Sequence, residues 1–212
     1  MSRSQPAHVI FDFGAVLFRW EPLVLFREVL PQRAWDEVLT RALADRVFKG
    51  FTGVWGRFDA GTIERDELVP ALVVQSGLRH DEIEALIDAI PAHLQPLPDT
   101  VALMDDLQAA GHRLFFLSNM PAPYAAHLSR THDFLRGFED GLFSCDVRMI
   151  KPDPAIFRLA LERFDVSARQ TLFIDDHLGN IEAANRLGLP ALLFTDAAGL
   201  ERDLVSRGVR LG

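Results

Sequence analysis

The sequence predicts an α/β fold: a mostly parallel sheet, covered by helices on both faces, with a helical insertion after its first strand. Three observations predict it. From residue 97 onward, short apolar runs alternate with amphipathic stretches of helical period, which is typical of strand–helix units in a parallel sheet. An apolar run at 8–12 precedes them, and the segment 19–96 between has helical period without a convincing strand. Hydrophobic residues make up 49% of the 212 residues, enough for a large core.

The elements of the sheet follow one another along the chain. The first strand is HVIFD at 8–12, and QPLPD at 95–99 is the linker that returns the chain from the insertion to the sheet. Asp99 near the start and Gly111 near the end are typical of the helix expected over 99–112. The other expected strands are 113–119, 141–147, 171–175 and 190–195, and the other expected helices are 121–132, 153–164, 180–189 and 199–208.

The insertion is expected to be entirely helical. Four stretches have helical period: 22–30, 32–48, 62–75 and 79–94. We therefore expect a core domain made of residues 1–18 and 97–212 and a helical cap domain made of residues 19–96. The stretch VWGRFDAGTI at 54–63 has mixed character, and two interpretations stay open. It is either a turn packed by its aromatic side chains or a segment that faces a ligand through a residue such as Arg57.

Composition restricts the partners and the compartment. The net charge is −8, and the 22 Lys and Arg residues are scattered, which argues against nucleic acid or an anionic membrane as a partner. The single cysteine, Cys145, cannot form an intramolecular disulfide, so a reducing compartment is expected. The start of the chain has neither the pattern of a signal peptide nor that of a membrane span. We expect a cytoplasmic protein, either a monomer or a homodimer.

Polar side chains follow several of the predicted strands. Because ligands of parallel α/β sheets bind beyond the carboxyl ends of the strands, these side chains are expected to meet at one edge. Lys151 precedes the helix expected at 153–164 and is expected at the same edge. The residues at the strand ends are Asp12 after the first strand, Ser118 and Asn119 after the second, and Asp175 and Asp176 after the strand at 171–175, with Asn180 shortly beyond.

These residue types suit a phosphate ester. The carboxylates of Asp12 and Asp176 are the hard ligands that Mg²⁺ prefers, and the small Gly14 lets a backbone carbonyl reach the metal. A metal that neutralises the phosphoryl charge allows a carboxylate to attack it, which gives an aspartyl-phosphate. Ser118 and neighbouring N–H groups can hydrogen-bond the phosphoryl oxygens, and Lys151 offsets the excess of negative charge.

Four motifs resemble the haloacid dehalogenase (HAD) superfamily, and they occur in its order and at its usual spacing: VIFDFGAVL, FFLSN, IKPDPAIF and FIDDHLGNIEAANRLG. The resemblance covers the whole chain, including a helical cap inserted after the first motif, as in the C1-cap phosphatase branch. Within that branch the chain is similar to bacterial sugar-phosphate phosphatases and to the N-terminal phosphatase domain of soluble epoxide hydrolase. The resemblance implies a Rossmann-like core and a small phosphate ester as substrate.

The resemblance also implies a role for each matching residue. Asp12 would be the nucleophile and a metal ligand, with Gly14 lending its carbonyl and Asp176 its carboxylate to Mg²⁺. Ser118 and Asn119 would bind phosphate. The remaining roles would fall to Lys151, which stabilises nucleophile and phosphate, to Asp175, which supports the metal shell or orients Lys151, and to Asn180, which orders the site from the start of its helix.

One position departs from the family pattern. Most phosphatases of the family carry a second aspartate two residues after the nucleophile as general acid and base, and here that residue is Gly14. Such proton transfer contributes about 100- to 10,000-fold in rate. We expect that His177, directly after the aspartate pair, or a cap residue such as Asp59 partly substitutes. Glycine at this position also occurs in the sugar-phosphatase branch.

The favoured function is therefore a Mg²⁺-dependent phosphomonoesterase acting on a small phosphorylated metabolite such as a sugar phosphate. A catalytically weak protein that binds a phosphorylated ligand or a partner is the alternative that Gly14 favours. A 2-haloacid dehalogenase shares the nucleophile and residues of the Ser118 and Lys151 type. That alternative is disfavoured because the pair Asp175 and Asp176, without a cation, would repel a substrate carboxylate.

Overall fold

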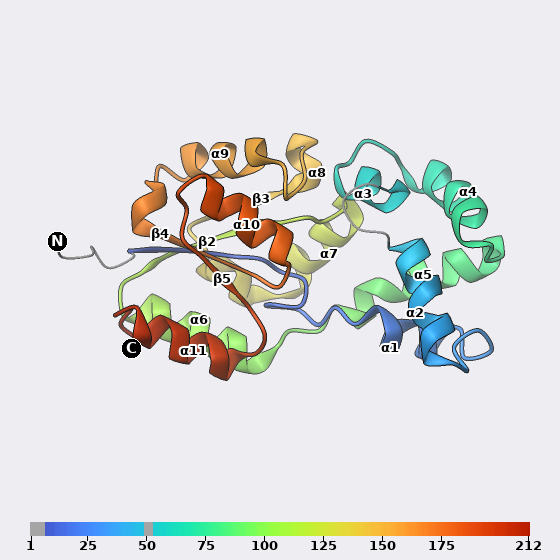
Figure 1. Cartoon of the computed structure of the whole chain (residues 1–212), viewed down its shortest axis with the longest axis horizontal. Coiled ribbons are helices and arrows are strands. Elements are labelled where there is room, and N and C mark those ends of the chain that lie inside the picture. Colours follow the sequence, from blue (N-terminus) through green and yellow to red (C-terminus); the bar gives the residue numbers. More distant parts are fainter. Residues whose placement is uncertain (1–6, 49–52) are drawn as a thin grey trace.

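The computed structural model of the chain, which describes residues 7–48 and 53–212, contains a five-stranded sheet (Figure 1). All its strands are parallel, and their order is β3-β2-β1-β4-β5, with β1 in the centre. The predicted α/β fold is confirmed. The strands are β1 (His8–Phe11), β2 (Arg113–Ser118), β3 (Asp140–Phe143), β4 (Thr171–Asp175) and β5 (Ala191–Leu193).

The register of the central strands brings their carboxyl ends to one level. Phe11, the last residue of β1, pairs with Phe116 of β2 and with Ile174 of β4. The backbone N–H of Asp12 still donates to the Ile174 carbonyl at 2.9 Å, so the pairing continues one residue past β1. Asp12 and the ends of β2 and β4 therefore lie at the same edge of the sheet.

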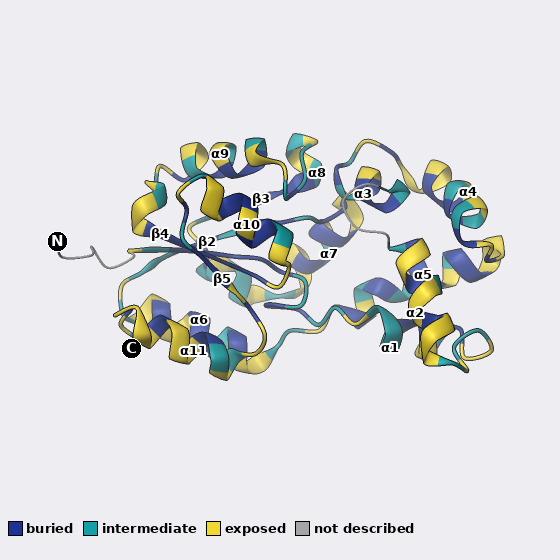
Figure 2. Ribbon diagram, in the orientation of Figure 1, coloured by how far each residue is buried: buried dark blue, intermediate teal, exposed yellow. Residues whose placement is uncertain are grey.

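Helices cover both faces of the sheet, and alternate residues of β1 point to opposite faces (Figure 1). Ile10 belongs to the hydrophobic cluster under α9 and α10, whereas Val9 and Phe11 belong to the cluster under α6 and α11. Every covering helix has one buried and one exposed side (Figure 2). The helices and 3₁₀ segments around the sheet are α6 (Pro98–Ala109), α7 (Ala122–Thr131), η1 (Asp133–Gly137), α8 (Ser144–Val147), α9 (Pro154–Arg163), η2 (Ala168–Gln170), α10 (Leu178–Arg186) and α11 (Ala197–Ser206).

A second group of helices lies beyond the carboxyl ends of the strands (Figure 1). Its members are α1 (Pro22–Val29), α2 (Glu37–Val47), α3 (Val54–Asp59), α4 (Arg65–Ser76) and α5 (His80–His93). The chain enters and leaves this group along two paired segments, where Arg19 N–H donates to Gln95 and Leu97 N–H donates to Leu17, both at 2.8 Å. We keep the name cap for the segment 19–96 as a proposal about its role.

Three predicted elements differ from the observed ones. The predicted strand 141–147 ends at Phe143, because Ser144 turns the chain into α8 and its hydroxyl bonds to two other segments. The stretch 54–63 contains a short helix, α3, that the sequence did not predict as one. The predicted helix 32–48 begins only at Glu37, because the side chain of Asp36 accepts a hydrogen bond from the Leu39 N–H and caps it there.

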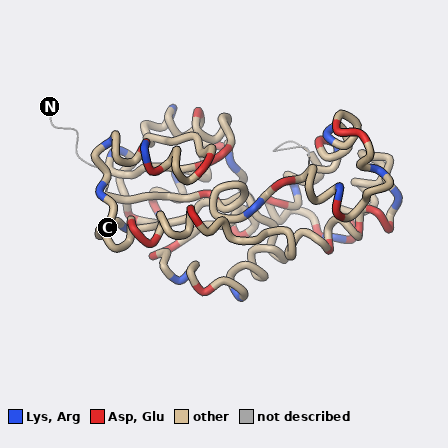
Figure 3. The backbone as a smooth tube through the Cα atoms, turned by 90° about the horizontal axis from the view of Figure 1, so that it is seen from below, with Lys and Arg blue, Asp and Glu red and all other residues tan. Residues whose placement is uncertain are grey.

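The charged residues are spread over both groups of elements, with Lys and Arg interspersed among Asp and Glu (Figure 3). Within residues 7–48 and 53–212, no helix is both long enough and apolar enough to cross a membrane.

Candidate active site

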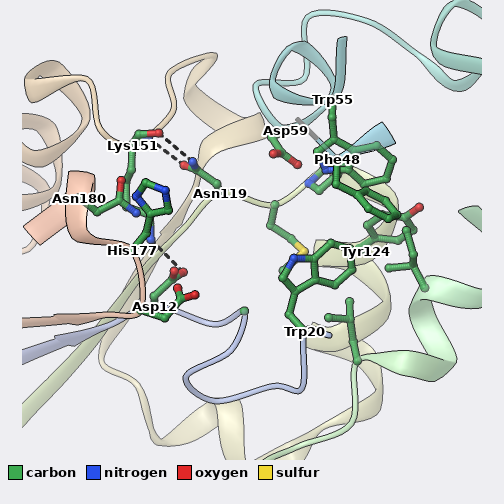
Figure 4. Close-up of a pocket in the computed structure, with 16 residues that line it drawn as sticks. Asp12, Trp20, Phe48, Trp55, Asp59, Asn119, Tyr124, Lys151, His177 and Asn180 are labelled. Carbon is green, nitrogen blue, oxygen red and sulfur yellow. Dashed lines mark hydrogen bonds and ion pairs between the residues drawn. The ribbon is translucent and has the colours of Figure 1, made fainter. Parts of the chain in front are cut away.

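A pocket of about 250 Å³ opens between the carboxyl edge of the sheet and the cap helices (Figure 4). Its lining has two kinds of wall. One wall is polar and is built mainly by the loops that follow the strands: Asp12, Gly14, Asn119, Lys151, Asp176, His177 and Asn180. The other wall is apolar and is built mainly by the cap: Trp20, Phe48, Trp55, Ile90, Leu94, Met120, Pro121 and Tyr124. Asp59 of α3 lies between the two walls (Figure 4).

Lys151 is the centre of the polar wall. Its ammonium is completely buried and lies 2.8 Å from Asp12 Oδ1 and 2.7 Å from Asp175 Oδ2. Burial alone would lower the pKa of Lys151, but the two carboxylates outweigh it and raise that pKa above its usual value. Lys151 is therefore a fixed positive charge between the two aspartates.

Asp175 is held from several sides. Besides Lys151, its carboxylate accepts the backbone N–H of His177 at 2.8 Å. The amide Nδ2 of Asn180 lies 2.9 Å from both of its oxygens. Asp175 and Asn180, both buried, thus fix Lys151 and the start of α10 relative to β4. Asp175 is not among the residues that line the pocket.

Asp12 and Asp176 face the pocket and have less protein support. The pKa of Asp12 is raised to about 8, chiefly by burial; Lys151 opposes this rise, and the carboxylates of Asp175 and Asp176 add to it. Burial, and then the charge of Asp175, also raises the pKa of Asp176. One oxygen from each of the three aspartates can be chosen so that all lie within 4.8 Å of one another.

This cluster suits a divalent cation. Three carboxylates face the single ammonium of Lys151, so the ionised cluster has excess negative charge in a place where burial makes charge costly. Both oxygens of Asp175 already accept protein donors. Oδ1 of Asp12 accepts the Phe13 N–H at 2.7 Å and lies beside Lys151, so Oδ2 of Asp12 and the carboxylate of Asp176 are the groups most available to a metal ion. Oxygen ligands of this kind fit Mg²⁺. Gly14 lines the same pocket, beside them.

Of the two residues predicted to bind phosphate, one lines the pocket and the other does not. Asn119 lines the pocket, but its side chain is committed to the backbone of Lys151: Nδ2 donates to the Lys151 carbonyl at 2.9 Å and Oδ1 accepts the Lys151 N–H at 2.8 Å. The backbone of Asn119 and the second N–H of its amide remain for a ligand. Ser118, at the end of β2, is buried and does not line the pocket, and its Oγ has no hydrogen-bond partner among the described residues.

The two candidates for proton transfer both line the pocket. His177 is the N-cap of α10, and its Nδ1 accepts the Gly179 N–H at 3.2 Å. Asp59 is the last residue of α3, and burial raises the pKa of its carboxyl group to about 7. Arg57, the charged residue of this stretch that was considered for ligand contact, is exposed and does not line this pocket.

The apolar wall is what the sequence did not indicate. Trp20, Phe48 and Tyr124 come from distant parts of the chain, and each is indistinguishable in sequence from a residue of the core. No local pattern could have found them, because only the packing of the cap against the sheet brings them together. Trp55 and Asp59 fall in the stretch whose mixed character was noticed.

Comparison with known proteins identifies the family. Residues 7–188 match the family model of the haloacid dehalogenase-like hydrolases, and the chain belongs to this family. It is 31% identical over 189 residues to the sesquiterpene phosphatase astK of Aspergillus oryzae, a match that covers 89% of both chains. A match to the drimenol cyclase drtB of Aspergillus calidoustus is 24% identical and covers 93% of this chain but 36% of that protein. The phosphoglycolate phosphatase of Escherichia coli is 32% identical over 98 residues, 46% of this chain and 39% of that enzyme.

Solved structures show the same fold. A HAD family enzyme of Bacteroides thetaiotaomicron superimposes with a TM-score of 0.69 at 20% identity, covering 94% of this chain and all of that one. The same enzyme in complex with magnesium and inorganic phosphate gives 0.66 at 19% identity, covering 91% and 98%. The L-2-haloacid dehalogenase of Xanthobacter autotrophicus gives 0.66 at 19% identity, covering 96% and 84%.

Proposed function

We propose that this hydrolase is a Mg²⁺-dependent phosphomonoesterase whose substrate carries its phosphate on an apolar organic group. The observation that carries the proposal is the division of the pocket. Asp12 and Lys151 stand beside a carboxylate cluster that fits a divalent cation, and the opposite wall is built from aromatic and aliphatic side chains.

The polar wall supplies the chemistry in this proposal. Asp12 attacks phosphorus, and Lys151, 2.8 Å from Asp12 Oδ1, keeps the nucleophile oriented and neutralises charge on the phosphoryl group. Asp12 and Asp176, with the carbonyl of Gly14, would hold Mg²⁺, which when bound neutralises phosphoryl oxygens. The backbone N–H of Asn119 and the unpartnered hydroxyl of Ser118 are the proposed donors to phosphate.

The apolar wall selects the substrate. A sugar phosphate needs hydrogen-bonding partners for several hydroxyl groups, and polar groups left unpaired in a buried site are costly. Trp20, Phe48 and Trp55 cannot satisfy an array of hydroxyls. An apolar ligand, in contrast, gains about 25 cal/mol of binding free energy for each Å² of apolar surface that it buries against them. The similarity to a sesquiterpene phosphatase supports the same choice. We therefore favour a terpenoid or alkyl phosphate over the sugar phosphate expected from the sequence.

The test compares phosphate release from n-decyl phosphate, farnesyl monophosphate, glucose 6-phosphate and p-nitrophenyl phosphate, with Mg²⁺ and with EDTA. We expect release that requires the metal, is lost in Asp12→Asn, and has a higher kcat/KM for the apolar esters than for the sugar ester. Binding of these esters without phosphate release would show the alternative, a phospho-ligand-binding protein. A preference for the sugar ester would contradict the proposed substrate class, though not the phosphatase.

A further inference from the structure

The pocket needs a group that transfers a proton. When the ester of an alkyl alcohol is cleaved, its oxygen leaves as a strongly basic alkoxide unless it receives a proton during the step. Gly14 offers no carboxyl group at the position two residues after Asp12. We infer that Asp59, contributed by helix α3 of the cap, is the general acid and base of this site, an assignment that rests on the proposed phosphatase function.

Three other titratable side chains of the pocket are already committed. Lys151 forms ion pairs with Asp12 and with Asp175. Asp12 is the proposed nucleophile, and Asp176 is the proposed metal ligand with it. None of these three can also serve the leaving oxygen without giving up that role.

Tyr124 and His177 are less suited to the task for reasons of hydrogen bonding. The hydroxyl of Tyr124 donates to the Ile87 carbonyl at 3.2 Å, and burial raises its pKa far above the neutral range. Nδ1 of His177, the N-cap of α10, accepts the Gly179 N–H at 3.2 Å, so this ring nitrogen is already used to hold the start of that helix.

Asp59 has the location and the environment that the role demands. It lies between the polar wall, where phosphorus would sit beside Asp12, and the aromatic wall, where the organic group would sit (Figure 4). The bridging ester oxygen joins those two parts of the substrate. The indole of Trp55, one turn earlier on α3, favours the ionised form of this carboxyl group and lowers its pKa.

The backbone of Asp59 is fixed to the core, although the residue belongs to the cap. The Asp59 carbonyl accepts the hydroxyl of Ser144 at 2.5 Å, and that hydroxyl in turn accepts the N–H of Met120 at 2.9 Å. Just beyond α3, Gly61 has a φ of +62°, and a Cβ there would lie 2.9 Å from the carbonyl oxygen of Cys145. The end of α3 thus rests directly on the loops that follow β2 and β3.

The electrostatic environment suits a group that first gives and then takes a proton. The pKa of Asp59 is raised to about 7 because burial outweighs the ammonium of Lys151 and the indole of Trp55, which both lower it. A value near the working pH is best for a residue that is acid in one step and base in the next. Helices α4 and α8 pack against α3, and the titratable residues that these two helices carry are Arg65, Asp66, Glu67, Cys145 and Asp146.

The two steps balance as follows. A carboxylate oxygen of Asp12 forms a bond to phosphorus while the bond from phosphorus to the ester oxygen breaks, and that oxygen takes the proton of the Asp59 carboxyl group, giving the free alcohol. The Asp59 carboxylate then takes a proton from water as its oxygen attacks phosphorus. The bond from phosphorus to Asp12 breaks, inorganic phosphate leaves, and both aspartates return to their initial states.

The experiment measures single-turnover rates of the first step for n-decyl phosphate and for p-nitrophenyl phosphate, whose phenolate leaves without a proton. For Asp59→Asn we expect about a 100- to 10,000-fold loss with the decyl ester and a much smaller loss with the nitrophenyl ester. Because the second step also loses its base, a burst of nitrophenolate should precede slow turnover. Asp66→Asn removes the same charge from an exposed position of the cap and is the matched control.

The ratio of the two rates decides the outcome. The ratio is the rate for the decyl ester divided by the rate for the nitrophenyl ester. If this ratio falls at least tenfold in Asp59→Asn and is retained in Asp59→Glu and in Asp66→Asn, the assignment is supported. A fall of less than tenfold in a variant that melts like the wild type overturns it. If the wild type itself releases no phosphate from either ester with Mg²⁺, the proposed function fails, which is a different result from an active enzyme that is indifferent to Asp59.

Discussion

Replacing Lys151 by methionine should destabilise the protein in a way that depends on pH. Methionine has about the same length and no charge, so Lys151→Met leaves the buried Asp12 and Asp175 without their common partner. Removing one member of a buried ion pair costs about 3 to 5 kcal/mol, because the remaining charge stays desolvated. We expect a loss of this size in the free energy of unfolding at pH 8 in EDTA.

The sign of the pH dependence follows from the carboxyl groups. Without the ammonium that opposes burial, the pKa of Asp12 in the folded protein rises further above its unfolded value. The folded state then holds protons that the unfolded state has released, so the stability of the variant decreases as the pH rises from about 4 toward the folded pKa. At pH 5.5, where the carboxyl group stays protonated when folded, the loss relative to the wild type should be smaller than at pH 8.

The assay is urea unfolding at pH 5.5 and pH 8, with and without Mg²⁺. The control Arg202→Met, at an exposed position of α11, should change the free energy of unfolding by less than about 0.5 kcal/mol at either pH. Because the variant has the greater excess of negative charge, Mg²⁺ should stabilise it more than it stabilises the wild type. An equal loss at both pH values, or a loss below about 1 kcal/mol at pH 8, would refute the buried charge cluster as described.

Three further predictions concern the pocket. Asp176→Asn should weaken Mg²⁺ binding at least about tenfold, as measured by calorimetry. Its melting temperature in EDTA should stay within a few degrees of the wild-type value. An unchanged affinity for Mg²⁺ would remove Asp176 from the metal site. Trp20→Leu should raise KM for n-decyl phosphate about 5- to 30-fold, equivalent to about 1 to 2 kcal/mol of lost apolar contact. Inhibition by inorganic phosphate should stay the same, because phosphate binds at the polar wall. A parallel change in both would contradict the division of the pocket into a polar and an apolar wall. Ser144→Ala should lower the single-turnover rate with the decyl ester more than with p-nitrophenyl phosphate, because it releases the backbone of Asp59; equal losses would make Ser144 merely structural.

The polar half of the pocket could be predicted from the sequence because strand ends are local features. A buried apolar run that ends in a carboxylate marks both the strand and the point where it stops, as at Asp12 and Asp175. Parallel pairing then brings such ends to one edge, and no knowledge of side-chain packing is needed. Lys151 was expected at the same edge because it stands just ahead of the helix expected at 153–164. The sequence could not show that the amide of Asn119 holds the backbone of Lys151, since the two residues are 32 apart.

The end of β3 illustrates the opposite case. The run GLFSCDV has enough apolar residues for a longer strand, yet the chain turns at Ser144. The reason lies outside the run, because the Ser144 hydroxyl bonds to Met120 and Asp59, which are 24 and 85 residues away in sequence. Local propensity favours continuation, and tertiary hydrogen bonds decide against it.

The same tertiary contacts explain how a chain with glycine at position 14 can still place a carboxyl group in the pocket. Gly14 and Asp59 line one cavity, although one lies in the loop after β1 and the other in the cap. The bond from Ser144 to the Asp59 carbonyl and the close approach of Gly61 to Cys145 hold α3 against the loops of the core. An acid on a freely moving cap would reach the leaving oxygen only in a fraction of closed states, whereas one anchored in this way is already in position when the substrate binds. In the mechanism proposed for this site, the docking of α3 against the core loops is what lets Asp59 take the place of a carboxylate next to the nucleophile.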